Sequence, residues 1–300
     1  MQKIQERTIE LESTPATGFK VIWREFKKDK IAMFSLIILL LIIMGVFIWA
    51  PFIDQEKLME ISLLDEFAEP GTNGFLLGAD QGGSDVLGQL IIGARNSIAI
   101  AVVITIITGI LGIAIGIITG YYGGMIDNIF MRVIDFFMTL PTLMIIIVFV
   151  TIIPKYNVIT FILIMSLFLW VGTARLVRSK ALSESRRDYV NASKTMGTSD
   201  FVIMFKGIVP NLSSILIVEM TLNFAGNVGI ETGLSFLGFG LPPTTPSLGT
   251  LVSYASNPMV LSEKWWVWLP ASILILVLML GINYVGQALR RSADAKQRLG

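Results

Sequence analysis

Residues 31 to 53 read IAMFSLIILLLIIMGVFIWAPFI, a run without a charged side chain between Lys30 and Asp54. A helix needs about 20 apolar residues to cross the hydrocarbon core of a bilayer, so this run is long enough to span a membrane. The whole chain has 300 residues, of which 54% are hydrophobic and 15% are charged. Soluble domains carry about 25% charged residues. The sequence therefore predicts one integral membrane domain rather than two soluble domains.

Five further apolar runs follow the first, and one of them contains a single acid, Glu219. Residues 232–261 are also uncharged, but Gly and Pro crowd them, which favours a loop or a re-entrant segment. The prediction is an all-α integral membrane fold with six transmembrane helices inside a domain of residues 31–289. The predicted spans are about 31–53, 97–119, 136–154, 157–175, 211–230 and 265–289.

The distribution of Lys and Arg predicts the orientation. Seven of these residues fall in 1–30, seven in 175–206 and four in 290–300, whereas residues 54–94 contain one Lys and eight acids. Lys and Arg near span ends favour the cytoplasmic side. We therefore expect both termini to be cytoplasmic, with an N-terminal segment 1–30, a loop 178–210 and a tail 290–300 on that side. The first 20 residues carry acids and no apolar core, so the first run is expected to stay as an anchor.

Missing residue types exclude most enzyme classes. The sequence contains no Cys and no His, so disulfides, thiolate nucleophiles, histidine metal sites and imidazole bases are excluded. It also contains no G-x-x-x-x-G-K-[ST] phosphate loop. The spacing of Asp80 and Asp85 is more typical of a helix cap than of a metal loop. We expect no catalytic residue, no metal, no bound cofactor and no nucleic-acid partner for this chain.

Residues 188–211, DYVNASKTMGTSDFVIMFKGIVPN, form a polar stretch between two apolar runs. Their apolar residues recur at helical spacing, which predicts two short helices broken at Gly197. A polar side chain within 198–200 is expected to cap the second helix. The small side chains of Ala192 and Ser193 favour close approach of another backbone, as in a docking surface. The alternative is a solvated connector.

This stretch resembles the EAA loop of ABC importer permeases, whose pattern is E-A-A, three residues, G, nine residues, I-x-L-P. The Ala, the Gly and the Pro match, whereas Asn replaces Glu, Ser replaces Ala, Gly replaces Ile and Val replaces Leu. The corresponding positions are Asn191, Ala192, Ser193, Gly197, Gly207, Val209 and Pro210.

Nearly the whole chain resembles the C subunit of the dipeptide and oligopeptide importers. Phe75 and Leu76 stand where that family often has His-Pro, and Ser84 stands where it often has Arg. The stretches that carry the resemblance are FKKDKIAMFSLIILL, LLGADQGGSDVLGQLIIGARNSI, GYYGGMID, RVIDFFMTLP and ETGLSFLGFGLPPTTPSLG.

The resemblance implies a type I permease fold in a bacterial or archaeal cell membrane. It implies a homologous B-type permease, two ATPase subunits that hold ATP and Mg, an extracytoplasmic binding protein and a peptide substrate as partners, besides membrane lipid. Nickel or metal chelates, haem and glutathione remain open as substrates, and a stand-alone secondary transporter remains the alternative of another class. Contact with the ATPase is implied for Tyr189, Asn191, Ala192, Ser193, Met196, Gly197, Thr198 and Pro210.

A few charged and polar residues within or beside the spans are further candidates. An ionised group at the bilayer centre costs at least about 2.5 kcal/mol, so Glu219 either lines the translocation path, together with Asn223, or is a buried, hydrogen-bonded or protonated acid. Glu231 is expected to support the turn that follows it. Arg132 and Asp135 share a helix face, which predicts an ion pair, with gating as the alternative.

Overall fold

The computed structural model describes residues 19–154, 156–242 and 245–299, and describes side chains only from Trp23 to Ala293. Predictions for residues 1–18 and for the side chains of 294–300 lie outside the described residues. Within the described ranges the chain is helical, and the one β-type contact is an isolated bridge between Ala79 and Asp85. The predicted all-α class is confirmed.

Thirteen α-helices are described, and two of them, α10 and α11, are joined by a π-helical turn, Ile203–Ile208. Their bounds are α2 Phe19–Phe26, α3 Lys30–Trp49, α4 Gln55–Leu58, α5 Val86–Tyr122, α6 Gly124–Thr139, α7 Thr142–Ile152, α8 Val158–Glu184, α9 Asp188–Thr195, α10 Asp200–Val202, α11 Val209–Phe236, α12 Leu248–Ser253, α13 Pro258–Glu263 and α14 Trp265–Leu299.

Five helical segments of the described chain are long and apolar enough to cross a membrane. They are Lys30–Phe52, Val86–Tyr122, Val158–Glu184, Asp200–Phe236 and Trp265–Ala293. Several extend beyond the predicted spans, because a helix does not end where its apolar stretch ends. Thus α5 begins at Val86 rather than near residue 97, and α8 continues into the predicted loop 178–210.

The predicted span 136–154 is not one straight helix. It is divided between α6, which ends at Thr139, and α7, which begins at Thr142, and the two helices are bent by 81°. Pro141 explains the break, because proline has no N–H to donate and keeps the preceding residue out of the helical conformation. Leu140 is accordingly extended, with φ −85° and ψ 137°. The described part of the chain therefore has six candidate spans if this bent pair counts as one, and five otherwise.

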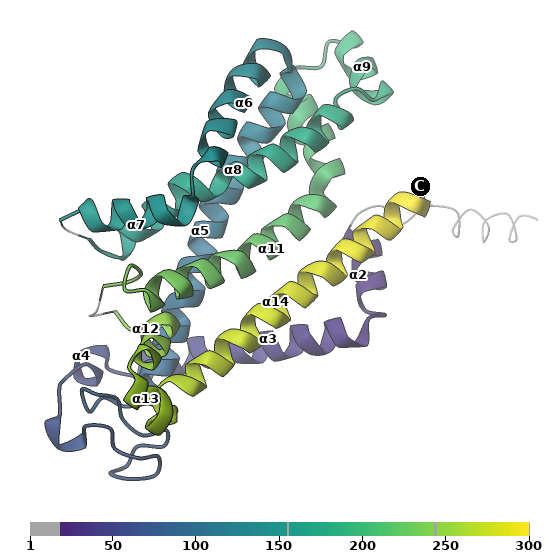
Figure 1. The fold of residues 1–300 in the computed structure, drawn as a ribbon. Coiled ribbons are helices and arrows are strands. Elements are labelled where there is room, and N and C mark those ends of the chain that lie inside the picture. Colours follow the sequence, from purple (N-terminus) through teal and green to yellow (C-terminus); the bar gives the residue numbers. More distant parts are fainter. Residues whose placement is uncertain (1–18, 155, 243–244, 300) are drawn as a thin grey trace, which may run out of the picture.

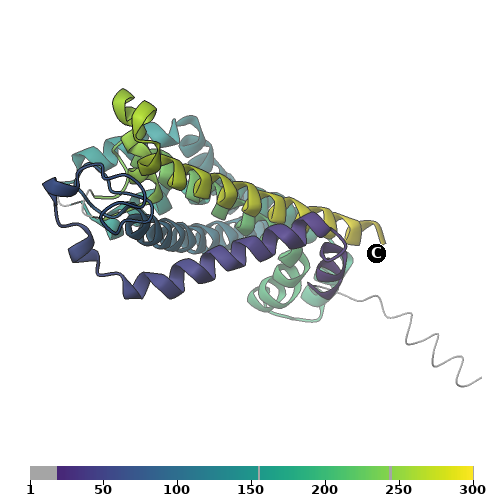
Figure 2. The ribbon, with the colours of Figure 1, turned by 90° about the horizontal axis from the view of Figure 1, so that it is seen from below.

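The long helices run side by side and give the molecule two distinct ends. Figures 1 and 2 both show α2, α9 and the C-terminal end of α14 at one end, which we call the elbow end. Both views show α4 and α13 at the opposite end, which we call the loop end. The first described helix, α2, and the C-terminal end of α14 thus lie at the same end, opposite residues 54–85.

The α5–α8 pair makes the most extensive helix contact in the described chain. Gly112, Gly116 and Gly120 recur every four residues on α5 and face α8 directly. A Cβ atom placed on Gly116 would lie 2.7 Å from the carbonyl oxygen of Ala174, and one placed on Gly120 would lie 2.6 Å from that of Arg178. Small residues repeated at this spacing let two membrane helices approach closely. This glycine row therefore fixes the separation of α5 and α8.

Two aspartates organise the loop end. Asp85 caps α5 by accepting two N–H groups of its first turn, at 3.2 and 3.0 Å. Asp80 is buried and accepts hydrogen bonds from Gln89 Nε2 at 2.6 Å and from the Tyr254 hydroxyl at 2.9 Å. Burial and the neighbouring carboxylate raise the pKa of Tyr254, so its hydroxyl stays protonated and donates. No group of three or more potential metal ligands occurs among the described residues.

Candidate coupling site

The polar stretch after α8 folds into a helical elbow that turns at Gly197. The helix α9 ends at Thr195, and Gly197 has φ +78°, in the left-handed region that favours glycine. The N–H of Thr198 bonds the carbonyl of Ser193 at 3.0 Å, and the N–H of Gly197 bonds that of Lys194 at 3.0 Å. This pair of bonds closes the end of a helix around a left-handed residue. Gly197 is therefore needed for the turn itself.

The second arm of the elbow differs from the prediction of a separate short helix. The helix that begins at Asp200 continues through the π-helical turn into α11 and ends at Phe236. The predicted polar cap is also wrong, because Ser199 stands at the N-cap position without a side-chain capping bond. The physical reason is that residues Asp200–Phe236 form one continuous helical segment, long and apolar enough to cross a membrane, so its first turn is part of that segment. The elbow is consequently a direct extension of a span.

The predicted contact residues divide into two groups. Tyr189 and Ser193 are half-buried and hold the elbow together: Tyr189 donates from its hydroxyl to Glu184 Oε1 at 3.1 Å, and Ser193 donates to the Tyr189 carbonyl at 2.8 Å. Thr198 is also half-buried. The exposed residues are Asn191, Ala192, Met196, Gly197 and Pro210. The exposed side chains are therefore free to meet a partner, whereas the others shape the elbow.

Two further residues enlarge the exposed surface and were missed by the sequence analysis. Phe201 and Phe205 are 64% and 55% exposed, and their ring centroids lie 4.4 Å apart. Met196 is 82% exposed. The signal in the sequence was a pair of aromatic residues four positions apart within a polar stretch, which places both on one helix face. We call Asn191, Ala192, Met196, Gly197, Phe201 and Phe205 the elbow surface.

A hydrophobic cluster lies under the elbow surface. Its buried members come from α5, α8, α9, the π-helical turn and α11, so the elbow packs on three membrane-crossing helices. They are Ile117, Tyr121, Val177, Ala181, Val190, Ile203, Met204, Ile208, Leu212 and Leu216. The elbow is thus packed against these helices on one side and exposed on the other.

A partly buried ion pair at the same end was also missed. The guanidinium of Arg178 on α8 donates through Nε to Asp127 Oδ1 at 2.8 Å and through a second nitrogen to Oδ2. Asp127 is 7% exposed and lies in the first turn of α6. Bidentate pairs of this kind are directional as well as strong. The pair fixes the start of α6 against α8. Its two residues are 51 positions apart in the sequence, so no local pattern predicts that they meet.

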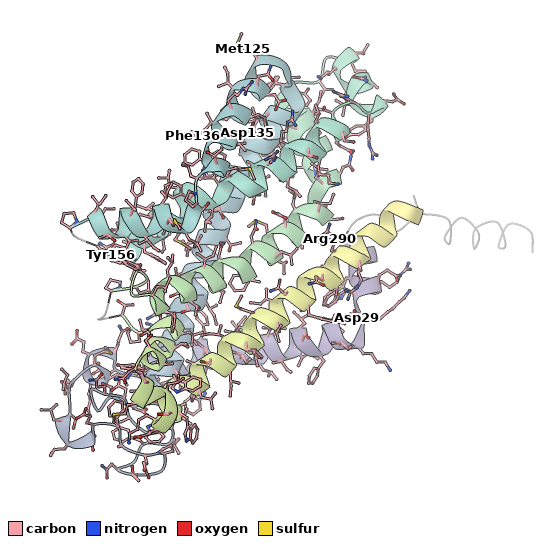
Figure 3. All side chains as sticks on the ribbon, viewed as in Figure 1. Asp29, Met125, Asp135, Phe136, Tyr156 and Arg290 are labelled. Atoms are coloured by element: carbon pink, nitrogen blue, oxygen red, sulfur yellow. The ribbon has the colours of Figure 1, made fainter. Side chains whose placement is uncertain are left out.

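The predicted ion pair between Arg132 and Asp135 does not form. Asp135, which Figure 3 labels on α6, instead lies 3.9 Å from an Arg175 nitrogen, and both side chains are 53% exposed. Arg132 is exposed and pairs with no acid in the described part of the chain. A pair three residues apart gains only about 0.2–0.5 kcal/mol on a helix surface, so a cation from the neighbouring α8 competes with it easily.

The two predicted path residues lie on the inner side of α11. Asn223 donates to Thr173 Oγ1 on α8 at 2.8 Å and to Glu219 Oε1 at 3.4 Å. Glu219 also lines a cavity of about 120 Å³ whose other polar residues are Lys180 and Arg290. Asn227, four residues beyond Asn223, donates to Thr105 Oγ1 on α5 at 2.9 Å. Polar residues every four positions thus connect α11 to α5 and α8.

Glu231 lies at the loop end of α11 and is completely buried. Its Oε1 accepts a hydrogen bond from the Ser235 hydroxyl at 2.8 Å. The Ser235 oxygen in turn accepts from the Leu241 N–H at 3.3 Å. The carboxyl group is therefore connected to the turn that follows α11. Residues 243 and 244 of this segment lie outside the described residues.

Five or six helical segments long and apolar enough to cross a membrane, with a packed elbow at one end, define the described chain as a multi-pass membrane protein. Residues 112–298 match the family described as binding-protein-dependent transport system inner membrane component. Residues 17–66 match the N-terminal TM domain of oligopeptide transport permease C. The chain belongs to the family of binding-protein-dependent inner membrane components, and the resemblance seen in the sequence is confirmed.

Curated relatives match nearly the whole chain. The oligopeptide transport system permease protein OppC of Lactococcus lactis subsp. lactis (strain IL1403) is 53% identical over 276 residues, which cover 92% of this chain and 94% of the relative. The dipeptide transport system permease protein DppC of Haemophilus influenzae is 34% identical over 289 residues, covering 94% and 96%. OppC of Bacillus subtilis (strain 168) is 34% identical over 281 residues, covering 92% and 90%.

Proposed function

We propose that this chain is the C-type permease subunit of an ATP-driven importer of oligopeptides or dipeptides. The observation that carries the proposal is the 53% identity to an oligopeptide permease over 92% of the chain. The dipeptide permease relative covers a similar share of the chain, so both peptide lengths belong to the proposed substrate class. Uptake is driven by ATP hydrolysis on other subunits.

The proposed partners are a homologous second permease, two ATPase subunits and an extracytoplasmic substrate-binding protein. Two observations support them. The sequence has no phosphate loop of its own, so the energy has to come from another chain. The elbow surface exposes Met196, Phe201 and Phe205 on a packed base, which suits a protein partner better than water. The ATPase subunits would hold ATP and Mg and would receive the elbow.

Within the membrane we propose that Glu219 and Asn223 line the translocation path and that Glu219 binds a peptide amine. The position of the Glu219 carboxylate at a cavity that Lys180 and Arg290 also line supports the path position, since intramembrane ionisable groups are usually functional. For Glu231 we propose support of the turn after α11. Gating remains a proposal for Arg132 and Asp135.

Reconstitution tests the proposed function. The chain is co-expressed with its neighbouring permease and ATPase subunits and placed in proteoliposomes with the binding protein and a radiolabelled oligopeptide. Uptake is expected to require both ATP and the binding protein, and to stop with a non-hydrolysable ATP analogue. Uptake by the lone chain, driven by an ion gradient without ATPase subunits, would establish the secondary-transporter alternative instead.

The second expected result concerns the orientation of the chain in the membrane. We propose that the elbow end is cytoplasmic and the loop end is outside, from the Lys and Arg distribution. Single cysteines replace the exposed Ser183 and Glu66 in this cysteine-free chain. An impermeant thiol reagent is expected to label position 66 in intact cells and position 183 only after permeabilisation. The reverse pattern would invert the topology, and a cysteine-free chain controls for background labelling.

A further inference from the structure

One tyrosine at the end of α5 touches both arms of the elbow. Tyr121 is 5% exposed and lies in the last turn of α5. Its hydroxyl donates to Asp200 Oδ1 at 2.5 Å. The ammonium of Lys194 lies over the face of the same ring, 4.3 Å from its centroid. Lys194 precedes Gly197 and Asp200 follows it, so a single side chain is bonded to both sides of the glycine turn.

Both contacts are directional, and they join side chains on the two sides of a turn whose backbone is closed by the bonds at Gly197 and Thr198. A hydrogen bond to a carboxylate is short and strong, and a cation over an aromatic ring is held at the ring face. Gly197 itself contributes no side chain, and nothing lies within 4 Å of the place where its Cβ would be. Tyr121 therefore adds two directional contacts, one to each arm, to the hydrophobic cluster under the elbow.

The position of Tyr121 also connects the elbow to a second membrane helix. The second arm already continues covalently into α11. Tyr121 belongs to α5, which the glycine row holds firmly against α8. A displacement of the elbow would therefore reach α11 through the backbone and the α5–α8 pair through the Tyr121 contacts.

We propose that Tyr121 is a positioning residue of the transporter, which fixes the angle of the elbow and transmits its displacement to the α5–α8 pair. This inference rests on the proposed function, because it assumes that an ATPase displaces the elbow. Tyr121 contacts neither substrate nor nucleotide. Its role is to make α5 and α11 move together, since rigid-body transmission requires contacts that do not yield.

Tyr122 provides the matched control. It follows Tyr121 directly and contacts it edge to face, with ring centroids 5.2 Å apart. It is 48% exposed, and its hydroxyl makes no hydrogen bond within the described chain. Tyr121→Phe and Tyr122→Phe delete the same atom from neighbouring residues, and only the first deletion removes a bond to the elbow. Asp200→Ala removes the same bond from the other side and leaves the ring in place.

The experiment has a structural and a functional readout. Spin labels are placed on cysteines at Thr195 and Met125, which are exposed on the elbow and at the start of α6. Tyr121→Phe is expected to broaden the distance distribution between the labels. In the assembled transporter it is expected to lower the amount of peptide imported per ATP about fivefold or more, with ATPase subunits still bound at the wild-type ratio. Tyr122→Phe is expected to change neither measurement.

The outcomes separate this inference from the proposed function. If the wild-type complex shows no ATP-driven uptake, the proposed function fails, while the spin-label distances still decide whether Tyr121 holds the elbow. If Tyr121→Phe keeps the wild-type distances and the wild-type uptake per ATP, the inference is wrong. The double variant with Asp200→Ala is expected to be no worse than either single variant, and full additivity would show that the hydroxyl and the carboxylate act separately.

Discussion

Gly197→Val is expected to abolish peptide uptake while the chain still reaches the membrane in normal amounts. Gly197 has φ +78°, and an added Cβ would meet open space, so the cost is conformational strain rather than a clash. A residue with a Cβ in this conformation costs about 1 kcal/mol or more, and a β-branched residue is worse. The variant relieves the strain by opening the turn, which displaces α9 from the Tyr121 contacts. Uptake and ATP hydrolysis in nanodiscs, with and without loaded binding protein, measure the effect.

Gly197→Asn is the control for this experiment. Asparagine tolerates the left-handed conformation better than other residues with side chains, so most of the coupling should return. Partial activity of the Asn variant beside an inactive Val variant would identify the backbone conformation as the cause. If the Val variant instead assembles and couples hydrolysis to uptake like the wild type, the elbow is a connector without a coupling role.

Gly116→Leu is expected to lower the amount of folded protein in the membrane to a small fraction of the wild-type amount. A Cβ at this position would already lie 2.7 Å from the Ala174 carbonyl oxygen and 2.7 Å from Val177 Cβ. These atoms belong to the backbone and the packed face of α8, so they cannot move aside as a flexible side chain does. Overpacking costs about 1–3 kcal/mol, and at Gly116 it separates the helix pair with the most extensive contact. Membrane level and thermal melting of the purified chain measure the loss.

Gly45→Leu is the matched control for the glycine row. Gly45 lies on the membrane-crossing helix α3, and nothing lies within 4 Å of the place where its Cβ would be. The added side chain there should leave the melting temperature nearly unchanged. Equal behaviour of the two leucine variants would show that the α5–α8 contact does not limit stability, and that the glycine row does not set the helix separation.

The amino-acid sequence by itself determined the membrane class, the helical fold and the position of the elbow turn. Each of these three features depends on a property of a short stretch of sequence. An uncharged run of sufficient length has to be helical in a bilayer, because its backbone groups find no water there. A glycine inside a helical pattern ends the helix where φ turns positive, as at Gly197. The break at Pro141 is also a local feature of the sequence, but the predicted span 136–154 did not take it into account.

Only the tertiary structure decided which charged and polar side chains meet. Asp127 pairs with Arg178 across 51 residues, Tyr121 bonds Asp200 across 79, and Tyr254 bonds Asp80 across 174. Asp135 lies 3.9 Å from Arg175 on α8 and does not pair with Arg132 on its own helix, α6. These contacts depend on which helix faces pack together. The glycine row of α5, for example, permits close packing only because it faces the backbone of α8. The composition of a short stretch of sequence carries no information on such pairings, whereas helix packing determines them.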